Sequence, residues 1–558
     1  MKRTLFLVLL TIPLVLLAKS APRQERSGAK SLLKTAPAAA GETTPNTAGP
    51  YTLLAWSELG MHCMDGKDYS VFSVLPPYNV IHAQLVKRGE PPTAVISGVT
   101  LTYTARTDTR GSINTSSWNK TNFWTWVQAI FHANPPPDRG LTGNDVQSLA
   151  AHPMTYNSKL SVWEVTGIPT VPFDDAMASK PYPMATVTAK DRSGKVLATA
   201  SVVLAVSDEM TCSQCHRSNT DPFAKPNAGW ENNSDPAKDV KLNILKKHDD
   251  RWNIISHLPD LQKEGYFYQS TLYQTAKGGT PILCAACHST NALGAKGVPG
   301  VNPLTSDMHS LHGPVVNLQT GTTLDNATTP FASCYLCHPG KVTKCQRGPM
   351  NKVACFHCHG NLTKIGLLTR TGWLDEPACQ MCHTNSMRYP TTFDSNGNWR
   401  VTNDKTFATN PNKPITGKEL YRFSSGHGGV YCSGCHGSQH AEYPTLQAND
   451  NVYSVAIQGY QGKLVECSSC HTAVPTSLNK GPHTMHAIGQ AWVNAHSSYA
   501  QNGGYTVCAY CHGPNYTGLF LSKIPTTRTF TVEDNGQKTF PAGHLVSCYD
   551  CHNGPQGG

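Results

Sequence analysis

Small and β-branched residues alternate with polar residues in two stretches of the N-terminal part of the chain, 184–189 and 195–206. Alternation with a period of two predicts β-strands. The two stretches flank the turn Asp191-Arg192-Ser193-Gly194, an arrangement that predicts a β-hairpin. Residues 95–104 show the same enrichment in β-branched side chains. We therefore expect a mostly-β domain over residues 51–207.

One segment of this domain, residues 122–132, has a helical pattern and carries Phe123, Trp124, Trp126 and Phe131. Aromatic side chains bury large apolar areas in protein cores. We therefore expect the four rings to pack in the core of the β-rich domain, and an aromatic binding surface is the alternative.

The first residues of the chain have the pattern of a secretory signal peptide. Lys2 and Arg3 precede an apolar run over residues 5–17, and the small residues Ala18 and Ser20 follow it. The run is too short to span a bilayer as a helix. We therefore expect a signal peptide over residues 1–20, with a retained membrane anchor as the alternative.

The rest of the chain fits an exported protein. Residues 21–50 are Ala, Thr, Pro, Gly and Lys without periodicity, which predicts a flexible linker. No Cys precedes Cys63, so a lipid anchor at the cleavage site is not expected, and no later segment has 18 consecutive apolar residues. We expect a periplasmic, outer-surface or extracellular protein whose mature chain has no transmembrane segment.

The pattern changes at Cys212, where the motif C-x-x-C-H appears for the first of nine times. With 20 Cys and 24 His in 558 residues, roughly 0.03 such motifs would arise by chance, so the repetition is a strong signal. The nine motifs are Cys212, Cys215 and His216; Cys284, Cys287 and His288; Cys334, Cys337 and His338; Cys355, Cys358 and His359; Cys379, Cys382 and His383; Cys432, Cys435 and His436; Cys467, Cys470 and His471; Cys508, Cys511 and His512; and Cys548, Cys551 and His552.

This spacing has a chemical reason. Two thiols three positions apart can add to the two vinyl groups of a haem, and the next residue places an imidazole beneath the iron. A zinc site uses tetrahedral sets of Cys and His and requires no His directly after each C-x-x-C, and a disulfide framework requires none either. The motifs therefore predict nine covalent c-type haems, with the 18 motif cysteines as attachment sites and the nine motif histidines as proximal iron ligands.

From about residue 209 to the C-terminus, the chain resembles the secreted multihaem c-type cytochromes of anaerobic, often metal-reducing bacteria. The stretch Gly428-Gly429-Val430-Tyr431-Cys432-Ser433-Gly434-Cys435-His436-Gly437 is similar to that family beyond the bare motif. The resemblance implies electron transfer along a chain of stacked haems, with other redox proteins or extracellular electron acceptors as partners. One branch of the family assembles into filaments, so a homo-oligomer or filament is an open alternative.

Distal ligands are expected among the other histidines. Four of these, His62, His82, His132 and His152, belong to the β-rich domain, and His357 lies inside a motif. Ten candidates remain for nine irons, enough for bis-His ligation with one to spare, so Met350, Met381 and Met387 are not expected to be ligands. The ten are His248, His257, His309, His312, His427, His440, His483, His486, His496 and His544.

Spacing gives further expectations for five of the ten. His309 and His312, like His483 and His486, are three residues apart, so on a helical turn each pair would share a face and reach two adjacent irons. His440 follows His436 by four residues, and we expect it to serve a neighbouring haem. His257 has the weakest context and is the expected spare.

The chain available per motif predicts the architecture of this second region. Residues 208–558 hold nine motifs, and motifs beginning at 334, 355 and 379 are only 21 and 24 residues apart. Haems this dense would fill the core in place of side chains. We expect a mostly-β domain over 51–207, then a nine-haem cytochrome c domain over 208–558 with short helices, long loops and sparse regular secondary structure.

The formal net charge of +10 invites a nucleic-acid partner, but the expected haems remove the surplus. Signal-peptide cleavage would take away Lys2, Arg3 and Lys19, and nine ferric haems with two propionates each would contribute about −9. The holoprotein would then be slightly acidic, with basic residues paired to propionates. No nucleic-acid partner is expected.

Cys63 and Cys345 are the two cysteines outside the motifs. In an oxidising compartment a disulfide between them and two separate thiols remain equally open. His62, next to Cys63, is expected to be a buried histidine of the β-rich domain; the alternative is a haem ligand.

Electron transfer through nine mostly bis-His haems is the function expected from these observations. A reductase of a small inorganic nitrogen or sulfur substrate is the alternative, although the C-x-x-C-K motif of the family's nitrite reductases is absent. A haem subunit whose role is to build a filament is a weaker alternative. No catalytic residue is predicted.

Overall fold

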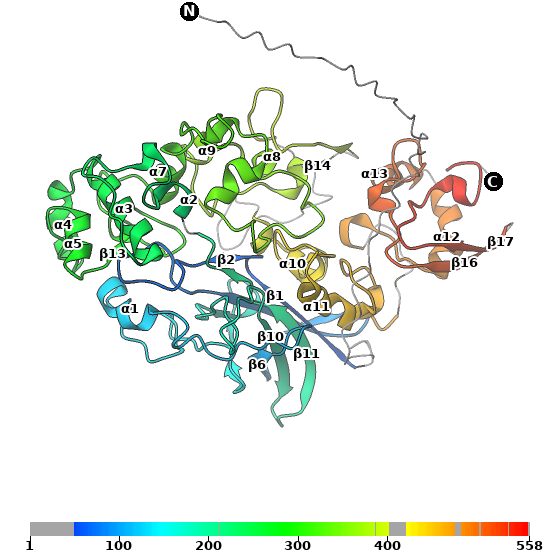
Figure 1. Ribbon diagram of the computed structural model, residues 1–558. Coiled ribbons are helices and arrows are strands. Elements are labelled where there is room, and N and C mark those ends of the chain that lie inside the picture. Colours follow the sequence, from blue (N-terminus) through cyan, green and yellow to red (C-terminus); the bar gives the residue numbers. More distant parts are fainter. Residues whose placement is uncertain are drawn as a thin grey trace, which may run out of the picture. The chain divides into compact units, whose positions relative to one another are not determined.

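Figure 1 shows a computed structural model of the chain. The structure describes residues 49–210, 212–384, 387–400, 420–473, 475, 481–501, 504–533 and 535–555. The predicted signal peptide over 1–20, and the predicted linker over 21–50 except for its last two residues, lie outside this part. The described residues belong to one compact unit.

The N-terminal part is rich in strands, as predicted, and forms two antiparallel sheets. The first sheet contains β1 (Tyr51–Ser57), β4 (Val80–Lys87), β9 (Val162–Thr166) and β8 (Thr155–Asn157) in this order, with β5 (Thr93–Val95) also pairing with β4. The second sheet has the order β11 (Val196–Val203), β10 (Met184–Asp191), β6 (Val99–Arg106) and β7 (His152–Pro153).

The predicted hairpin is confirmed, because β10 and β11 pair around the turn at Asp191–Gly194. Gly194 has a φ of 85°, a conformation that glycine adopts without strain. The single stretch expected over 95–104 is instead split between β5 and β6. Gly98, with a φ of 74°, lies in the turn that separates them.

The predicted helix is also confirmed, as α1 (Phe123–Phe131). Phe123, Val127 and Ile130 are buried on one side of it, and Trp124, Trp126 and Phe131 pack against the same cluster. The aromatic side chains of this helix therefore serve the core, as expected.

After residue 208 regular elements are mostly short. Only α3 (Pro236–Asp249), α11 (Ala448–Gln458) and α12 (Gln490–Gln501) exceed seven residues among the described α-helices of this region. The others are α2 (Ser213–His216), α4 (Leu258–Lys263), α5 (Leu272–Lys277), α6 (Cys284–Cys287), α7 (Leu304–Ser310), α8 (Cys355–His359), α9 (Leu362–Ile365), α10 (Cys432–His436) and α13 (Ala509–His512). The broad prediction of a β-rich part followed by short helices is confirmed.

Four short two-stranded sheets complete the fold. Two of them pair strands in parallel: β2 (His62–Cys63) with β12 (Val206–Ser207), and β3 (Phe72–Ser73) with β13 (Ile282–Leu283). The other two are antiparallel, β14 (His383–Thr384) with β15 (Met387–Arg388), and β16 (Arg528–Val532) with β17 (Gly536–Phe540). The pairing of β3 with β13 joins the β-rich part to the motif region.

The hydrophobic cores also cross the boundary near residue 207. One core combines the two sheets with Tyr431, Tyr453 and Ile457 of the motif region. A second core combines α1 with side chains from α3, α5 and α6. Packing therefore continues across residue 207, where the sequence pattern changes.

Strand β1 packs the β-rich part against the motif region. Its residues are buried on both faces, from Thr52 to Ser57. Leu54 and Trp56 lie against Gly434 of α10, so closely that a Cβ on Gly434 would stand 3.4 Å from Leu54 Cδ1. The Trp56 ring stacks on Tyr431, with 5.4 Å between the centroids. One face of this strand is thus covered by a motif helix.

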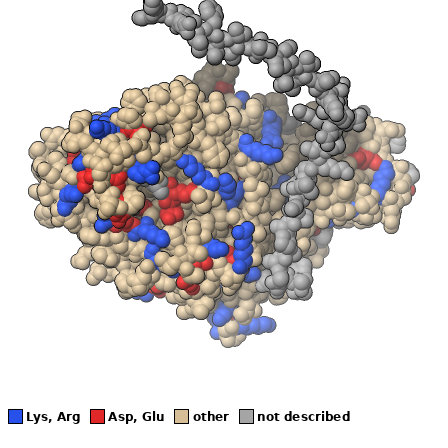
Figure 2. All heavy atoms as spheres, in the orientation of Figure 1, with Lys and Arg blue, Asp and Glu red and all other residues tan. Residues whose placement is uncertain are grey.

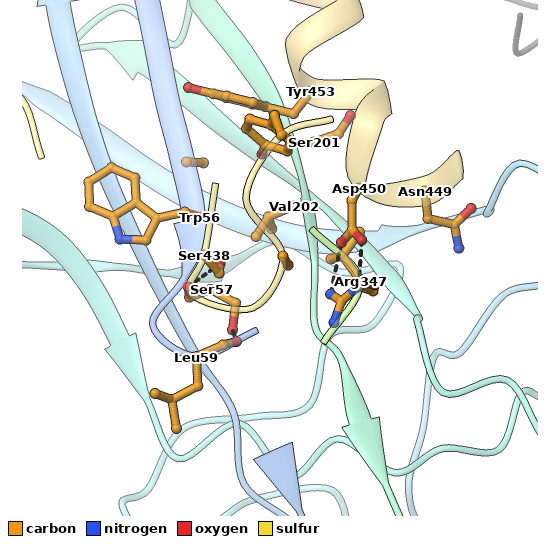
Figure 3. Close-up of a pocket in the computed structure, with 14 residues that line it drawn as sticks. Trp56, Ser57, Leu59, Ser201, Val202, Arg347, Ser438, Asn449, Asp450 and Tyr453 are labelled. Atoms are coloured by element: carbon orange, nitrogen blue, oxygen red, sulfur yellow. Dashed lines mark hydrogen bonds and ion pairs between the residues drawn. The ribbon is translucent and has the colours of Figure 1, made fainter. Parts of the chain in front are cut away.

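A buried ion pair reinforces this junction (Figure 3). Arg347 is 1% exposed, and its Nε and Nη2 donate to the two carboxylate oxygens of Asp450 at 2.6 and 2.9 Å. Its Nη1 donates to the carbonyl oxygen of Gly60 at 2.6 Å. The guanidinium therefore ties the loop after β1 to helix α11.

Surface charge is mixed on the face shown in Figure 2, where Lys and Arg side chains are interspersed with Asp and Glu. Within the described ranges, no helix is long and apolar enough to cross a membrane.

Replacing Asp450 by Asn should lower the free energy of unfolding by about 3–5 kcal/mol, because it leaves the buried Arg347 charge without its partner. Denaturant unfolding followed by circular dichroism measures the change. Lys263→Ala, which breaks the exposed Lys263–Asp260 pair, is the matched control and should leave the midpoint nearly unchanged. Equal midpoints for Asp450→Asn and the parent would contradict the role given to this pair.

Candidate functional site

Each C-x-x-C-H motif folds as a single helical turn. In five motifs the backbone N–H of the histidine donates to the carbonyl oxygen of the first cysteine, at 2.8–3.1 Å. Residues three apart on such a turn are neighbours, so each motif presents its two thiols on one side. The turns are α2, α6, η6 (Cys334–Leu336), α8, η7 (Cys379–Met381), α10, η10 (Cys467–Ser469), α13 and η14 (Cys548–Asp550). None of the 20 cysteines is part of a disulfide in the structure.

Seven motif histidines lie opposite a second histidine from elsewhere in the chain. The ring centroids are 5.7–6.4 Å apart in every pair. The pairs, with the motif residue first, are His216 with His312, His338 with His309, His359 with His440, His436 with His483, His471 with His427, His512 with His486, and His552 with His496.

This separation can be compared with the geometry of a metal held between two imidazoles. A metal–nitrogen bond of about 2 Å, plus roughly 1 Å from the nitrogen to the ring centroid, places the centroids of two axial ligands about 6 Å apart. The observed spacing matches this value in all seven pairs.

The remaining two motif histidines are less completely described. His288 lies close to His248, since its charge, after burial, lowers the pKa of His248 to about 4. His383 lies on β14, where burial and then the charge of Arg388 lower its pKa. Eight of the ten histidines predicted as distal ligands therefore lie beside a motif histidine.

Hydrogen bonding distinguishes the two nitrogens of these rings. In five of the paired histidines Nδ1 contacts a backbone carbonyl oxygen at 2.7–3.1 Å. His288 Nδ1 likewise contacts the carbonyl oxygen of Asn302 at 2.9 Å. Metal-bound histidines engage their second nitrogen in this way, which fixes the ring and assigns the metal to Nε2. The five are His309, His312, His486, His496 and His512.

Two pairs depart from the carbonyl pattern. Nδ1 of His471 contacts both carboxylate oxygens of Glu90 at 3.2 Å, and Nδ1 of His440 contacts Sγ of Cys345 at 3.6 Å. Nδ1 of His216 and of His248 is buried without a hydrogen-bond partner.

Three histidines outside the pairs use Nε2 in polar contacts, and one of them, His152, also uses Nδ1, which lies 3.3 Å from Asp145 Oδ2. Nε2 of His82 faces Glu164 at 3.5 Å, and Nε2 of His152 contacts Ser148 at 2.7 Å. Nε2 of His544, which the sequence predicted as a distal ligand, lies 2.8 Å from Asp550 Oδ2. His257, the expected spare, lies in η3 (Ile255–His257) and is in none of the described pairs.

Burial favours the neutral form of several of the paired imidazoles. It lowers the pKa of His309, His440 and His486 to about 4, and that of His359 and His436 to about 3. Positive neighbours, including the paired rings, add to the effect. At neutral pH these rings are unprotonated, which is the state that binds a metal.

Two pairs of distal candidates were expected to share a helical face, and only one of them, His309 and His312, does so. His309 lies in the last turn of α7 and His312 follows the helix. The Nδ1 atoms of both side chains contact carbonyl oxygens four residues earlier, as a helix predicts. His483, by contrast, has a φ of 54°, in a turn that begins at Pro482, so His483 and His486 do not share a helical face. They nevertheless face two different motif histidines.

The β-rich part contributes residues that the motif pattern could not reveal. Gly89 bridges to His471, Arg88 Nη2 donates to the carbonyl oxygen of Ser468 at 2.9 Å, and Thr52 donates to that of Ser469. Three consecutive residues, 88–90, therefore hold the seventh motif. No residue type or spacing in this segment indicated such a role.

The sixth motif is held in the same manner. The backbone N–H of Tyr431 donates to Gln84 Oε1 at 3.0 Å, and the Tyr431 hydroxyl donates to the carbonyl oxygen of Leu160 at 2.6 Å. Ser438, just after the motif, donates to the carbonyl oxygen of Ser57. The β-rich part is thus a scaffold for two motifs.

Among the described residues, no group of three or more His, Cys, Asp or Glu side chains is arranged to hold a metal ion. The arrangement found is instead a set of imidazole pairs, each beside a turn that carries two thiols. No protein-family model, curated protein or solved structure matches this chain.

Proposed function

We propose that the chain is an exported c-type cytochrome that transfers electrons through nine covalently bound haems. The observation that carries this proposal is the spacing of seven imidazole pairs, each formed by one motif histidine and one distant histidine, at 5.7–6.4 Å. Two opposed imidazoles are the protein ligands that a haem iron takes in addition to its porphyrin nitrogens.

The residues of each motif fit this group. The two thiols on one side of the turn would form thioethers with the haem vinyl groups, and the motif histidine would bind the iron from one face. The paired histidine would bind from the opposite face. Once bound, a haem supplies one-electron redox chemistry, and two axial imidazoles make its iron coordinatively saturated.

The chain's own residues set the state of each ligand in advance. Carbonyl oxygens such as Thr305 O and Met308 O hold Nδ1–H of His309 and His312, so that Nε2 is the nitrogen offered to a metal. Burial excludes the protonated form of the rings. The fold therefore orients these imidazole rings before a haem binds.

The order of the pairs supports electron transfer between neighbouring centres. His309 and His312 belong to the pairs of motifs three and one, and His436 and His440 to those of motifs six and four. His483 and His486 belong to the pairs of motifs six and eight. Ligands three or four residues apart in the chain keep the corresponding centres close to each other, as stacked haems require.

A reductase would need an iron with an open position for its substrate. The eight motif histidines that lie beside a second histidine favour saturated irons, and hence electron transfer, over this alternative.

The mass of the denatured mature protein should exceed that of the polypeptide by nine haems, and the haem should resist acid and organic extraction. Intact-protein mass spectrometry makes the measurement. Replacing Cys432 and Cys435 by Ala should remove one haem, whereas Cys63→Ala, outside the motifs, should remove none. A parent with fewer than eight haems, or with extractable haem, would contradict the proposal.

Replacing His309 by Ala should convert one low-spin haem into a high-spin haem while the number of covalent haems stays the same. The reduced variant should bind about one equivalent of carbon monoxide, and the parent almost none. His257→Ala, which removes an imidazole outside the described pairs, is the control. Strong carbon monoxide binding by the unmodified protein together with turnover of nitrite, hydroxylamine or tetrathionate would favour the reductase instead.

Glu90→Gln should raise the reduction potential of one centre in nine, because a neutral amide is a weaker acceptor for Nδ1–H of His471 than a carboxylate and makes the imidazole a poorer electron donor. Spectroelectrochemical titration should show about one ninth of the haem absorbance moving to higher potential. Asp260→Asn, whose carboxylate contacts Lys263 rather than an imidazole, should leave the titration unchanged. An unaltered curve for Glu90→Gln would refute this role.

A further inference from the structure

The two cysteines outside the motifs are brought together by the fold. Cys63 lies on β2 and pairs with Ser207 of β12, and the Ser207 hydroxyl contacts that of Thr343 at 2.9 Å. Cys345 follows Thr343 by two residues and packs in a small core with Met61 and Ala205. The charge of Cys345 acts directly on the Cys63 thiol, adding to burial in raising its pKa.

The segment that carries Cys345 is anchored on both sides. Arg347 donates to the carbonyl oxygen of Gly60, three residues before Cys63, and forms the buried ion pair with Asp450. Glu209 accepts hydrogen bonds from the backbone N–H of Val342 and Thr343. The positions of both thiols are therefore fixed by contacts that do not involve sulfur.

We propose that Cys63 and Cys345 form a redox-active dithiol that oxidises to a disulfide, cross-linking the β-rich part to the motif region. The inference rests on the proposed function in one respect, because thioether formation would leave these two as the free thiols of the chain. Neither cysteine is part of a disulfide in this structure.

The oxidant is an external disulfide, such as a thiol oxidoreductase in an oxidising compartment provides. Both S–H bonds break, the S–S bond forms, and two protons and two electrons pass to the external disulfide, which becomes two thiols.

Oxidation would also change the contact between Cys345 Sγ and His440 Nδ1. In the dithiol either atom can donate the hydrogen. In the disulfide sulfur has no hydrogen, so Nδ1–H becomes the donor. This selects the tautomer of His440 with a free Nε2, the same tautomer that backbone carbonyls select in His309 and His312.

The test uses the purified, haem-loaded full chain, unfolded in guanidinium with iodoacetamide, with and without prior reduction. Intact mass should show no alkyl addition without reduction and two after it. Peptide mapping without reduction should recover one species that joins the Cys63 peptide to the Cys345 peptide. After reduction and treatment with excess oxidised glutathione, the native protein should regain this species.

Cys63→Ser and Cys345→Ser are matched controls, and each should show one alkyl addition without reduction. Two additions to the unreduced parent, or glutathione adducts on both cysteines without a joined peptide, would overturn the cross-link. More than two additions after reduction would show that motif thiols lack thioethers. That result contradicts the proposed function, while the joined peptide still reports separately on Cys63 and Cys345.

Discussion

The distance of about 6 Å between paired imidazoles is the constraint on which the arrangement of the motif region depends. Each motif is a single short turn, and under the proposed function each must be placed so that its histidine meets a partner histidine. Partners come from helix ends, as with His309, from isolated turns, as with His483, and from a longer helix, as with His496. The region can therefore be irregular in its backbone and still regular in its ligand geometry.

The β-rich part supplies the rigidity that such a region lacks. Two antiparallel sheets share a core, and β1 carries buried side chains on both faces because α10 covers the face that carries Leu54 and Trp56. Residues 88–90 and Gln84, at the end and middle of β4, then hold the turns of motifs seven and six. The burial that stabilises the sheets therefore also fixes two of the proposed haem sites.

The sequence was sufficient for several features that depend on local pattern. The hairpin at Asp191–Gly194, helix α1 and the shortness of later helices follow from period, turn chemistry and motif density. Eight of ten distal candidates also lie beside motif histidines. The pairing itself could not be predicted, because His216 and His312, or His471 and His427, meet through tertiary contacts that leave no trace in spacing. The helical argument held for His309 and His312 but failed for His483, where Pro482 starts a turn whose second residue has a positive φ.

Nine identical motifs would give nine equivalent centres if the motif alone decided their properties. In this chain the centres differ in the group that contacts Nδ1 of their histidines. A backbone carbonyl holds His512, the carboxylate of Glu90 holds His471, and a thiol contacts His440. An anionic acceptor increases the electron density that the imidazole passes to a metal more than a carbonyl does, and a thiol does so less. If the motifs bind haem as proposed, a chain that repeats one ligand set can thus grade its centres by tertiary contacts alone, and all three of these contacts come from residues that no motif contains.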